Sequence, residues 1–392
     1  MAVESMGRAG RPPLGGVVAR VAKAPPADTV AALSGHLQPA VAAAWERGWQ
    51  PADLHRFIDR QVGPDAARVL REALADDAST YAELGGRAAP VWMAQLDDLG
   101  LVPGRGDLGA ALHRIGPTWT DALHLAFLLL GTLRALPTIP RLTDPPSAWV
   151  EGSRSPSGDV PAGLLAKIRA LLAKAESTTF DAEAEAYTAK AQELMARHRI
   201  DRALLADAGP AQDADVRGRR IGIEDPYATA KFLLLSGIAE ANGARAVWSK
   251  DLGSATVLGF PVELAIIEEL FTSLLVQATA AMRREGSKQD AYGRSRTKAF
   301  RRSFLVAYAD RVTDRLRHSV EDIVTAVATE TGTDLVPILA ARDDAVEARV
   351  DEVFPRLRSM SPSVSDAEGL YAGRLAADRA DLSAGPPIER SA

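Results

Sequence analysis

The sequence predicts a mainly α-helical protein with three parts: an N-terminal helical domain, a central αα-hairpin module, and a C-terminal α+β domain whose short β-hairpin packs on long helices. Three observations indicate this. The chain has 392 residues, which is more than one ordinary core accommodates. Aromatic residues make up only 5% while alanine is abundant, which favours closely packed helices over large sheets. Apolar residues recur at intervals of three and four over most of the chain.

Composition narrows the class of protein. The hydrophobic fraction of 47% and the charged fraction of 25% are typical of soluble globular proteins, and a net charge of −5 is mild for this length. Cysteine is absent, which excludes disulfides, thiolate metal sites and cysteine nucleophiles, and fits a reducing compartment. The first residues lack the apolar segment of a secretory signal, and the apolar run at 121–137 is too short to cross a bilayer. We therefore expect a cytoplasmic protein without a membrane partner.

The N-terminal third divides by composition into an arm, a domain and a linker. Residues 1–29 are rich in Gly, Pro and Ala with little periodicity, which predicts a mobile arm. Residues 30–136 are periodic at helical spacing, and Pro51 and Pro64 stand where helices begin, which predicts a helical domain. Residues 137–163 contain six prolines, which is typical of a linker.

The central segment, residues 164–208, predicts two helices. Leu164, Ile168, Leu171 and Leu172 form one apolar stripe at helical spacing, and Ala191, Leu194 and Met195 continue a second. Only the four residues STTF separate the two stripes. A connection this short joins neighbouring antiparallel helices, so we expect an αα-hairpin.

The C-terminal region, residues 224–382, combines helices with a few β-forming residues. DPYATAKFLLLSGIAEANG predicts a helix that ends at Asn–Gly. ARAVWSK and SATVLGF predict two short strands, and the intervening DLG predicts a hairpin turn. Pro261 begins a long apolar helix, the polar residues 285–297 form a loop, and a second long helix spans 298–330. Since a two-stranded sheet is marginal alone, these helices must cover it.

The helical pair contains two characteristic runs: KIRALLAKAES, from Lys167 to Ser177, and the run from Glu183 to His198 that contains AKAQELM. In these runs the chain resembles DUF2786, a family of uncharacterised bacterial and phage proteins. The motif residues are Lys167, Arg169, Glu176, Glu183, Glu185, Gln192 and His198. The region that follows looks like the domain that commonly accompanies this module, and the N-terminal domain looks like the helical extension of actinobacterial members. The family implies no established activity.

Catalytic patterns are absent or weak. GRGDLG at 104–109 has the spacing of a dinucleotide-binding loop but does not follow a predicted strand. Asp181 and Glu185 share a helix face that could suit a divalent cation, although acids in a first turn stabilise any helix. His198 is better explained by packing near a helix end. We expect no cofactor, no metal and no catalysis. The alternative is a metal-dependent hydrolase or nuclease that uses Asp181, Glu183, Glu185 or His198.

A basic cluster is the clearest functional signal. Residues 283–318 contain eleven Lys or Arg and four acids. The centre of the cluster comprises Arg294, Arg296, Lys298, Arg301 and Arg302, with no acid between 291 and 309. Cations at the start of a helix oppose its dipole at a cost of about 0.3–1 kcal/mol each, and a bound anion reverses this. Arg301 falls within the apolar stripe of Phe304, Leu305, Tyr308, Val312 and Leu316, so it could pair with a buried acid or stack on an aromatic ring.

Two binding functions are compatible with these patterns. We expect a non-catalytic binding protein whose basic cluster contacts nucleic acid or another phosphate-bearing partner. The cluster could instead neutralise the protein's own acids, such as Glu268 and Glu269 on the preceding helix. A further alternative to the nucleic-acid function is an adaptor that binds a protein partner through the alanine-rich faces of the αα-hairpin.

Overall fold

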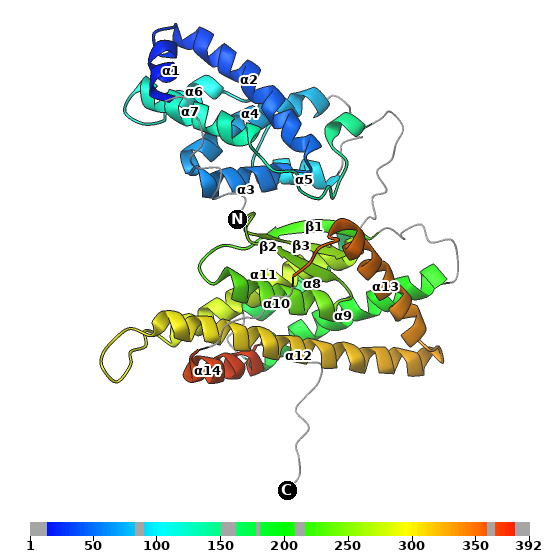
Figure 1. Ribbon diagram of the computed structural model, residues 1–392. Coiled ribbons are helices and arrows are strands. Elements are labelled where there is room, and N and C mark those ends of the chain that lie inside the picture. Colours follow the sequence, from blue (N-terminus) through cyan, green and yellow to red (C-terminus); the bar gives the residue numbers. More distant parts are fainter. Residues whose placement is uncertain are drawn as a thin grey trace. The chain divides into compact units, whose positions relative to one another are not determined.

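A computed structural model describes residues 14–82, 90–149, 162–177, 181–207, 216–358 and 365–380. The chain divides into two compact units, Met1–Ser157 and Gly158–Ala392, which we describe separately. The described residues are mainly helical and include one small antiparallel sheet, as the sequence predicts (Figure 1).

The N-terminal unit is helical throughout its described residues. Its helices are α1 (Leu14–Val21), α2 (Pro26–Glu46), α3 (Pro51–Gln61), α4 (Pro64–Ala82), α5 (Pro90–Asp98), α6 (Leu108–His113) and α7 (Trp119–Arg134), followed by a 3-10 turn at Pro146–Ala148. Prolines begin four of these helices, because a first-turn residue needs no N–H donor. Aromatic side chains fill the core: the Trp45 and Trp92 rings meet edge to face with centroids 5.0 Å apart.

Two segments of this unit are more ordered than their composition predicts. Residues 14–29, within the predicted mobile arm, form α1 and the first turn of α2, and Val18 is fully buried. The first half of the predicted linker packs on the unit: the Ile139 N–H donates to the Arg47 carbonyl at 2.9 Å, and the Trp149 ring contacts the rings of Tyr81 and Trp92. Glycine and proline content alone therefore does not distinguish these packed segments from a mobile arm or a linker. Residues 1–13 and 150–161 lie outside the described residues.

GRGDLG forms a loop that leads into the short helix α6. A Cβ atom at Gly106 would lie 2.3 Å from the Glu72 carbonyl oxygen, so close packing explains this glycine. Asp107 caps α6 by accepting a hydrogen bond from the Ala110 N–H at 2.7 Å. No strand precedes the loop in the described part of this unit, so a dinucleotide-binding arrangement is not formed.

The C-terminal unit contains the helical pair, the sheet and the longest helices. Its elements are α8 (Ala162–Ser177), α9 (Asp181–Asp207), β1 (Arg217–Gly222), α10 (Ala228–Ala241), β2 (Arg245–Ser249), β3 (Ser254–Gly259), α11 (Pro261–Arg284), α12 (Thr297–Thr331), α13 (Val336–Val353) and α14 (Ala367–Asp378). The bounds of α11 and α12 agree with the predicted helices 261–284 and 298–330 to within one residue.

The sheet has the order β1-β3-β2, with both pairs antiparallel. The predicted hairpin is confirmed as β2 and β3, which pair Trp248 with Ala255 and Val247 with Thr256. Strand β1 is not among the predicted elements, because RGRRIG contains only one β-branched residue and has a composition typical of a charged loop. The strand is held by its ladder to the buried strand β3, which is a tertiary interaction.

The helical pair contributes to the main core of this unit. Ile168, Leu172, Ala191 and Met195 are buried against side chains of α10, α11 and α12. The apolar stripe predicted on α12 is confirmed, since Phe304, Leu305, Tyr308, Val312 and Leu316 are all buried. Within the described residues, α11 is the one helix long and apolar enough to cross a membrane, and half of that stretch is buried, as in core helices.

Helix α14 lies unusually close to α12. A Cβ atom at Gly369 would lie 2.4 Å from the Phe300 carbonyl oxygen, and one at Gly373 would lie 2.2 Å from that of Phe304. Since both positions advance by four residues, the two helices run parallel and their N-termini lie at the same end of the unit. Glycine at these positions permits the contact, because any side chain would collide with the backbone of α12.

Candidate nucleic-acid interface

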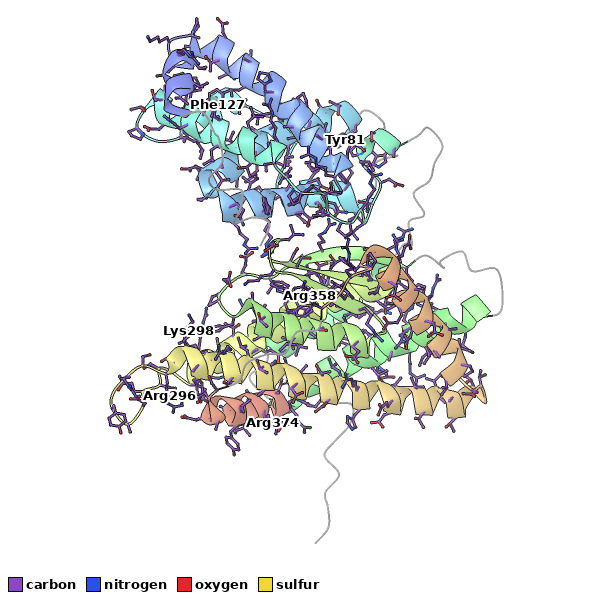
Figure 2. The ribbon with its side chains drawn as sticks, in the orientation of Figure 1. Tyr81, Phe127, Arg296, Lys298, Arg358 and Arg374 are labelled. Atoms are coloured by element: carbon purple, nitrogen blue, oxygen red, sulfur yellow. The ribbon has the colours of Figure 1, made fainter. Side chains whose placement is uncertain are left out.

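The predicted basic cluster lies where three helix ends meet. The last turn of α11, the loop 285–296 and the first turns of α12 and α14 share one end of the C-terminal unit, near the labelled Arg296 and Lys298 (Figure 2). We call this surface, comprising residues 283–302 and 365–368, the α11–α12 end face. It contains eight Lys or Arg and four Asp or Glu, a surplus of four positive charges.

Arg296 is a structural residue of this face. Its Nη1 atom lies 2.7 Å from Asp366 Oδ2, its Nη2 atom contacts Glu368, and its Nε–H donates to the Gln289 carbonyl at 3.1 Å. Asp366 is only 8% exposed and caps α14 by accepting from the Gly369 N–H at 2.8 Å. Arg296 therefore joins the start of α12 to the start of α14, and its charge is neutralised by the protein.

Two further cations are also neutralised. Lys288 Nζ lies 2.8 Å from Glu368 and 3.1 Å from Glu285, and the hydrogen bond from Lys288, followed by that from Arg296, lowers the pKa of Glu368. Arg294 Nε lies 2.8 Å from Asp290 Oδ2. All four acids of the face are therefore committed to three cations.

The other five cations have no carboxylate partner among the described residues: Arg283, Arg284, Lys298, Arg301 and Arg302. Arg302 donates from Nη2 to the Ser365 hydroxyl at 3.0 Å. Arg301 is half-buried, as the apolar stripe predicts, and its Nε–H is buried with no hydrogen-bond partner in the described structure. The remaining three side chains are exposed. Positive charge therefore remains on this face after every internal pair is formed.

The structure thus revises the predicted set of binding residues. Lys298, Arg301 and Arg302 have no carboxylate partner among the described residues, whereas Arg294 and Arg296 form ion pairs. The alternative that the cluster neutralises the protein's own acids holds for Arg294 and Arg296, which pair with Asp290, Asp366 and Glu368. The two acids named for it do not take part, because Glu268 pairs with Arg219 and Glu269 pairs with Arg169 at 2.7 Å. Arg283 and Arg284 belong to the predicted basic region 283–318 but not to the predicted binding residues. Their proximity to α12 depends on how the loop between α11 and α12 folds, which is a property of the tertiary structure.

A second charged cluster joins α9, α11 and α13 in the interior. The largely buried Arg342 lies 2.8 Å from the buried Glu263, and its guanidinium carbon is 3.6 Å from the centroid of the Phe260 ring. Burial lowers the pKa of His198, against the opposing effect of Glu263, and the His198 Nε2 atom has no hydrogen-bond partner in the described structure. The adjacent Asp343 of α13 pairs with Arg199 of α9 at 2.8 Å. This cluster cross-links three helices.

His198 and the acids at the start of α9 do not share one metal site. Lys167 is exposed and Arg169 pairs with Glu269, whereas the side chains of Glu176, Asp181, Glu183, Glu185 and Gln192 lie outside the described residues. Helix α9 is continuous, so thirteen residues separate Glu185 from His198. At 1.5 Å per residue this is about 20 Å, too far for a shared ion. No group of three or more potential ligands occurs within the described part of the chain.

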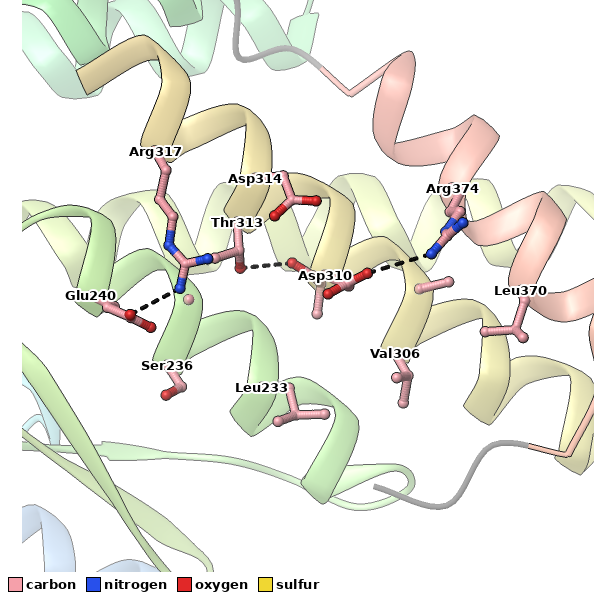
Figure 3. A pocket seen from close by; sticks show the side chains of 13 residues that line it. Leu233, Ser236, Glu240, Val306, Asp310, Thr313, Asp314, Arg317, Leu370 and Arg374 are labelled. Carbon is pink, nitrogen blue, oxygen red and sulfur yellow. Dashed lines mark hydrogen bonds and ion pairs between the residues drawn. The ribbon is translucent and has the colours of Figure 1, made fainter. Parts of the chain in front are cut away.

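A shallow groove of about 440 Å³ lies between α10, α12 and α14 (Figure 3). Arg317 lies 2.8 Å from Glu240, and Arg374 lies 3.7 Å from Asp310 (Figure 3). Gly237 allows the close approach of α10 to α12, since a Cβ atom there would lie 1.7 Å from Thr313 Oγ1. The lining holds three acids, Glu240, Asp310 and Asp314, and its two cations are both paired within the groove, so it offers no surplus positive charge to a phosphate.

Residues 163–202 match the family model DUF2786, which is described as a protein of unknown function. The resemblance of the helical pair α8–α9 to this family is therefore confirmed. The expected companion domain and actinobacterial extension stay predictions. Neither the curated proteins nor the solved structures include a match to the chain.

Proposed function

We propose that this protein is a non-catalytic nucleic-acid-binding protein, and that the α11–α12 end face holds the phosphate backbone. The observation that carries the proposal is the presence, beside the start of a 35-residue helix, of five cations that have no carboxylate partner among the residues that the structure describes. No side chain caps α12. Its first N–H groups and the nearby guanidinium groups would converge on a phosphate, which forms strong charge-assisted hydrogen bonds with both.

The energetics favour an anionic partner over an empty face. Cations near a helix N-terminus cost about 0.3–1 kcal/mol each, and Lys298, Arg301 and Arg302 lie within the first two turns of α12. The whole chain has a net charge of −5, yet these cations remain together at the N-terminal end of α12, while acids such as Glu268 and Glu269 pair with cations outside the end face. Phosphate binding offsets the cost, and the negative remainder of the chain orients the protein on the polyanion.

The salt dependence of binding tests the proposal. Fluorescence anisotropy should measure the affinity for labelled oligonucleotides between about 50 and 300 mM salt. If five phosphates are neutralised, the logarithm of affinity should fall against the logarithm of salt with a slope of about −4.5 for duplex and about −3.5 for single strands. A salt response with zero slope would refute the proposal.

Matched variants locate the surface. Substituting Gln at the exposed or hydroxyl-bonded cations Arg283, Arg284, Lys298 and Arg302 should flatten the slope to about −1, because one of five contacts remains. The control substitutes Gln at Arg356 and Arg358, which are exposed and follow α13 in the chain; Figure 2 labels Arg358. Because the control removes two cations and the test variant removes four, a control that flattens the slope by half as much would show that binding follows net charge and not this face.

The alternatives have less structural support. On the helical pair, Ile168, Leu172, Ala191 and Met195 are buried in the core, so a protein partner would be left with the exposed Ala166, Ala170 and Ala173 of α8. His198 lies about 20 Å along α9 from Glu185, so these two residues would not act in one hydrolase site.

A further inference from the structure

The loop between α11 and α12 is a structured turn, although its sequence predicts a polar loop. Asp290 organises it: the carboxylate oxygen Oδ1 accepts from the N–H groups of Tyr292 and Arg294, both at 2.9 Å. The Asp290 N–H donates to the Arg294 carbonyl at 2.9 Å, and the Gly293 N–H donates to the Asp290 carbonyl at 3.0 Å. The base of the turn is closed by a bridge between Gln289 and Ser295. These bonds hold the residue at the tip in a fixed position.

That residue is Tyr292, and its side chain faces solvent. It is 85% exposed, the highest value among the exposed large hydrophobic side chains of the described structure. The Arg294 guanidinium carbon lies 5.4 Å from the centroid of the Tyr292 ring, and Arg294 is itself held by Asp290. The turn therefore presents an aromatic ring and a cation together, in the loop that joins Arg284 to Lys298. An exposed ring on an ordered turn has little role in the stability of the unit, which points to a ligand that covers it.

We propose, resting on the proposed function, that Tyr292 stacks on an unpaired base and that the α11–α12 end face therefore binds single-stranded nucleic acid. Aromatic side chains beside a positively charged groove are the elements by which proteins bind single strands without sequence preference. A base within a duplex is already stacked on both sides, so the ring gains nothing from it. The five cations that have no carboxylate partner in the described structure contact the backbone of the strand while Tyr292 contacts one base.

The magnitude of this contact can be measured. Stacking on one aromatic ring changes single-strand affinity by about 5- to 140-fold when the ring is removed. Tyr292→Ala should therefore weaken binding of a labelled oligothymidine by that factor and change duplex affinity less than about twofold. Tyr292→Phe should bind oligothymidine like the unsubstituted protein, because stacking needs the ring and not the hydroxyl. Tyr371→Ala is the matched control, since Tyr371 is also exposed, at 72%, but lies on α14.

A photochemical experiment gives an independent readout. An oligonucleotide that contains 5-iodouracil should crosslink on irradiation to the peptide that contains Tyr292, and Tyr292→Ala should abolish that crosslink. Salt-dependent binding that Tyr292→Ala leaves unchanged would overturn this inference while the proposed function stands. The same holds if single-strand and duplex affinities fall equally. Absence of salt-dependent binding to either nucleic acid would overturn both.

Discussion

The contrast between Arg296 and Lys298 provides the sharpest test of the end face. Both are cations at the start of α12, but Arg296 pairs with Asp366 and Glu368 whereas Lys298 is exposed without a carboxylate partner in the described structure. Arg296→Gln leaves the Asp366 carboxylate buried without its counter-charge. Breaking a buried ion pair in this way costs about 3–5 kcal/mol. Since Arg296 is 31% exposed and Asp366 keeps its bond from the Gly369 N–H, we expect about half of that, roughly 1.5–2.5 kcal/mol.

Hydrogen exchange measured by mass spectrometry reports this cost locally. Peptides that cover residues 365–380 should exchange about 10- to 70-fold faster in Arg296→Gln, because α14 opens more easily. Lys298→Gln should change the same rates by less than about threefold, since exposed substitutions alter stability by about 0.5 kcal/mol or less. Lys298→Gln should instead lower the salt slope of binding by about one. If both variants affect α14 equally, or if Arg296→Gln leaves α14 protected, the assignment of Arg296 to structure is wrong.

Three further predictions concern stability. Gly373→Ala should destabilise the C-terminal unit by about 1–3 kcal/mol in urea denaturation, because the new methyl group would meet the Phe304 carbonyl; an equal effect of Gly163→Ala, which meets no atom, would refute this. Glu263→Gln should lower the free energy of unfolding by about 3–5 kcal/mol, because it leaves the largely buried Arg342 without its partner. A double variant, Glu263→Leu with Arg342→Met, replaces both charges by apolar side chains, and it would contradict this reasoning if it were as unstable as Glu263→Gln. Burial raises the pKa of Asp77 from 3.8 to about 6, so its contribution is fully present below 3.8 and lost as pH rises through about 6. The N-terminal unit, which holds five of the six tryptophans, should therefore gain roughly 1 kcal/mol between about pH 7.5 and about pH 5 by tryptophan fluorescence, and Asp77→Asn should remove this gain.

Local patterns in the sequence determined the helices, the hairpin and the basic region of this protein. The prolines that begin α3, α4 and α11, the Asn–Gly that ends α10 and the apolar stripe of α12 act through the backbone and neighbouring turns. Such interactions span a few residues, so reading the chain in order recovers them. The match of residues 163–202 to DUF2786 depends in the same way on a contiguous run.

Contacts between distant residues decided the rest. Strand β1 has few β-forming residues and is stabilised by its hydrogen-bonded pairing with β3. Residues 14–29 and 137–149 fold because they pack against apolar side chains that lie far from them in the sequence. The availability of each cation was also a tertiary outcome. Asp366 and Glu368 lie about seventy residues after Arg296, and only the parallel packing of α14 on α12 brings them to it. Charge count follows from composition, whereas the charge left for a ligand depends on which acids the fold brings within reach, because ion pairing acts over a few ångströms.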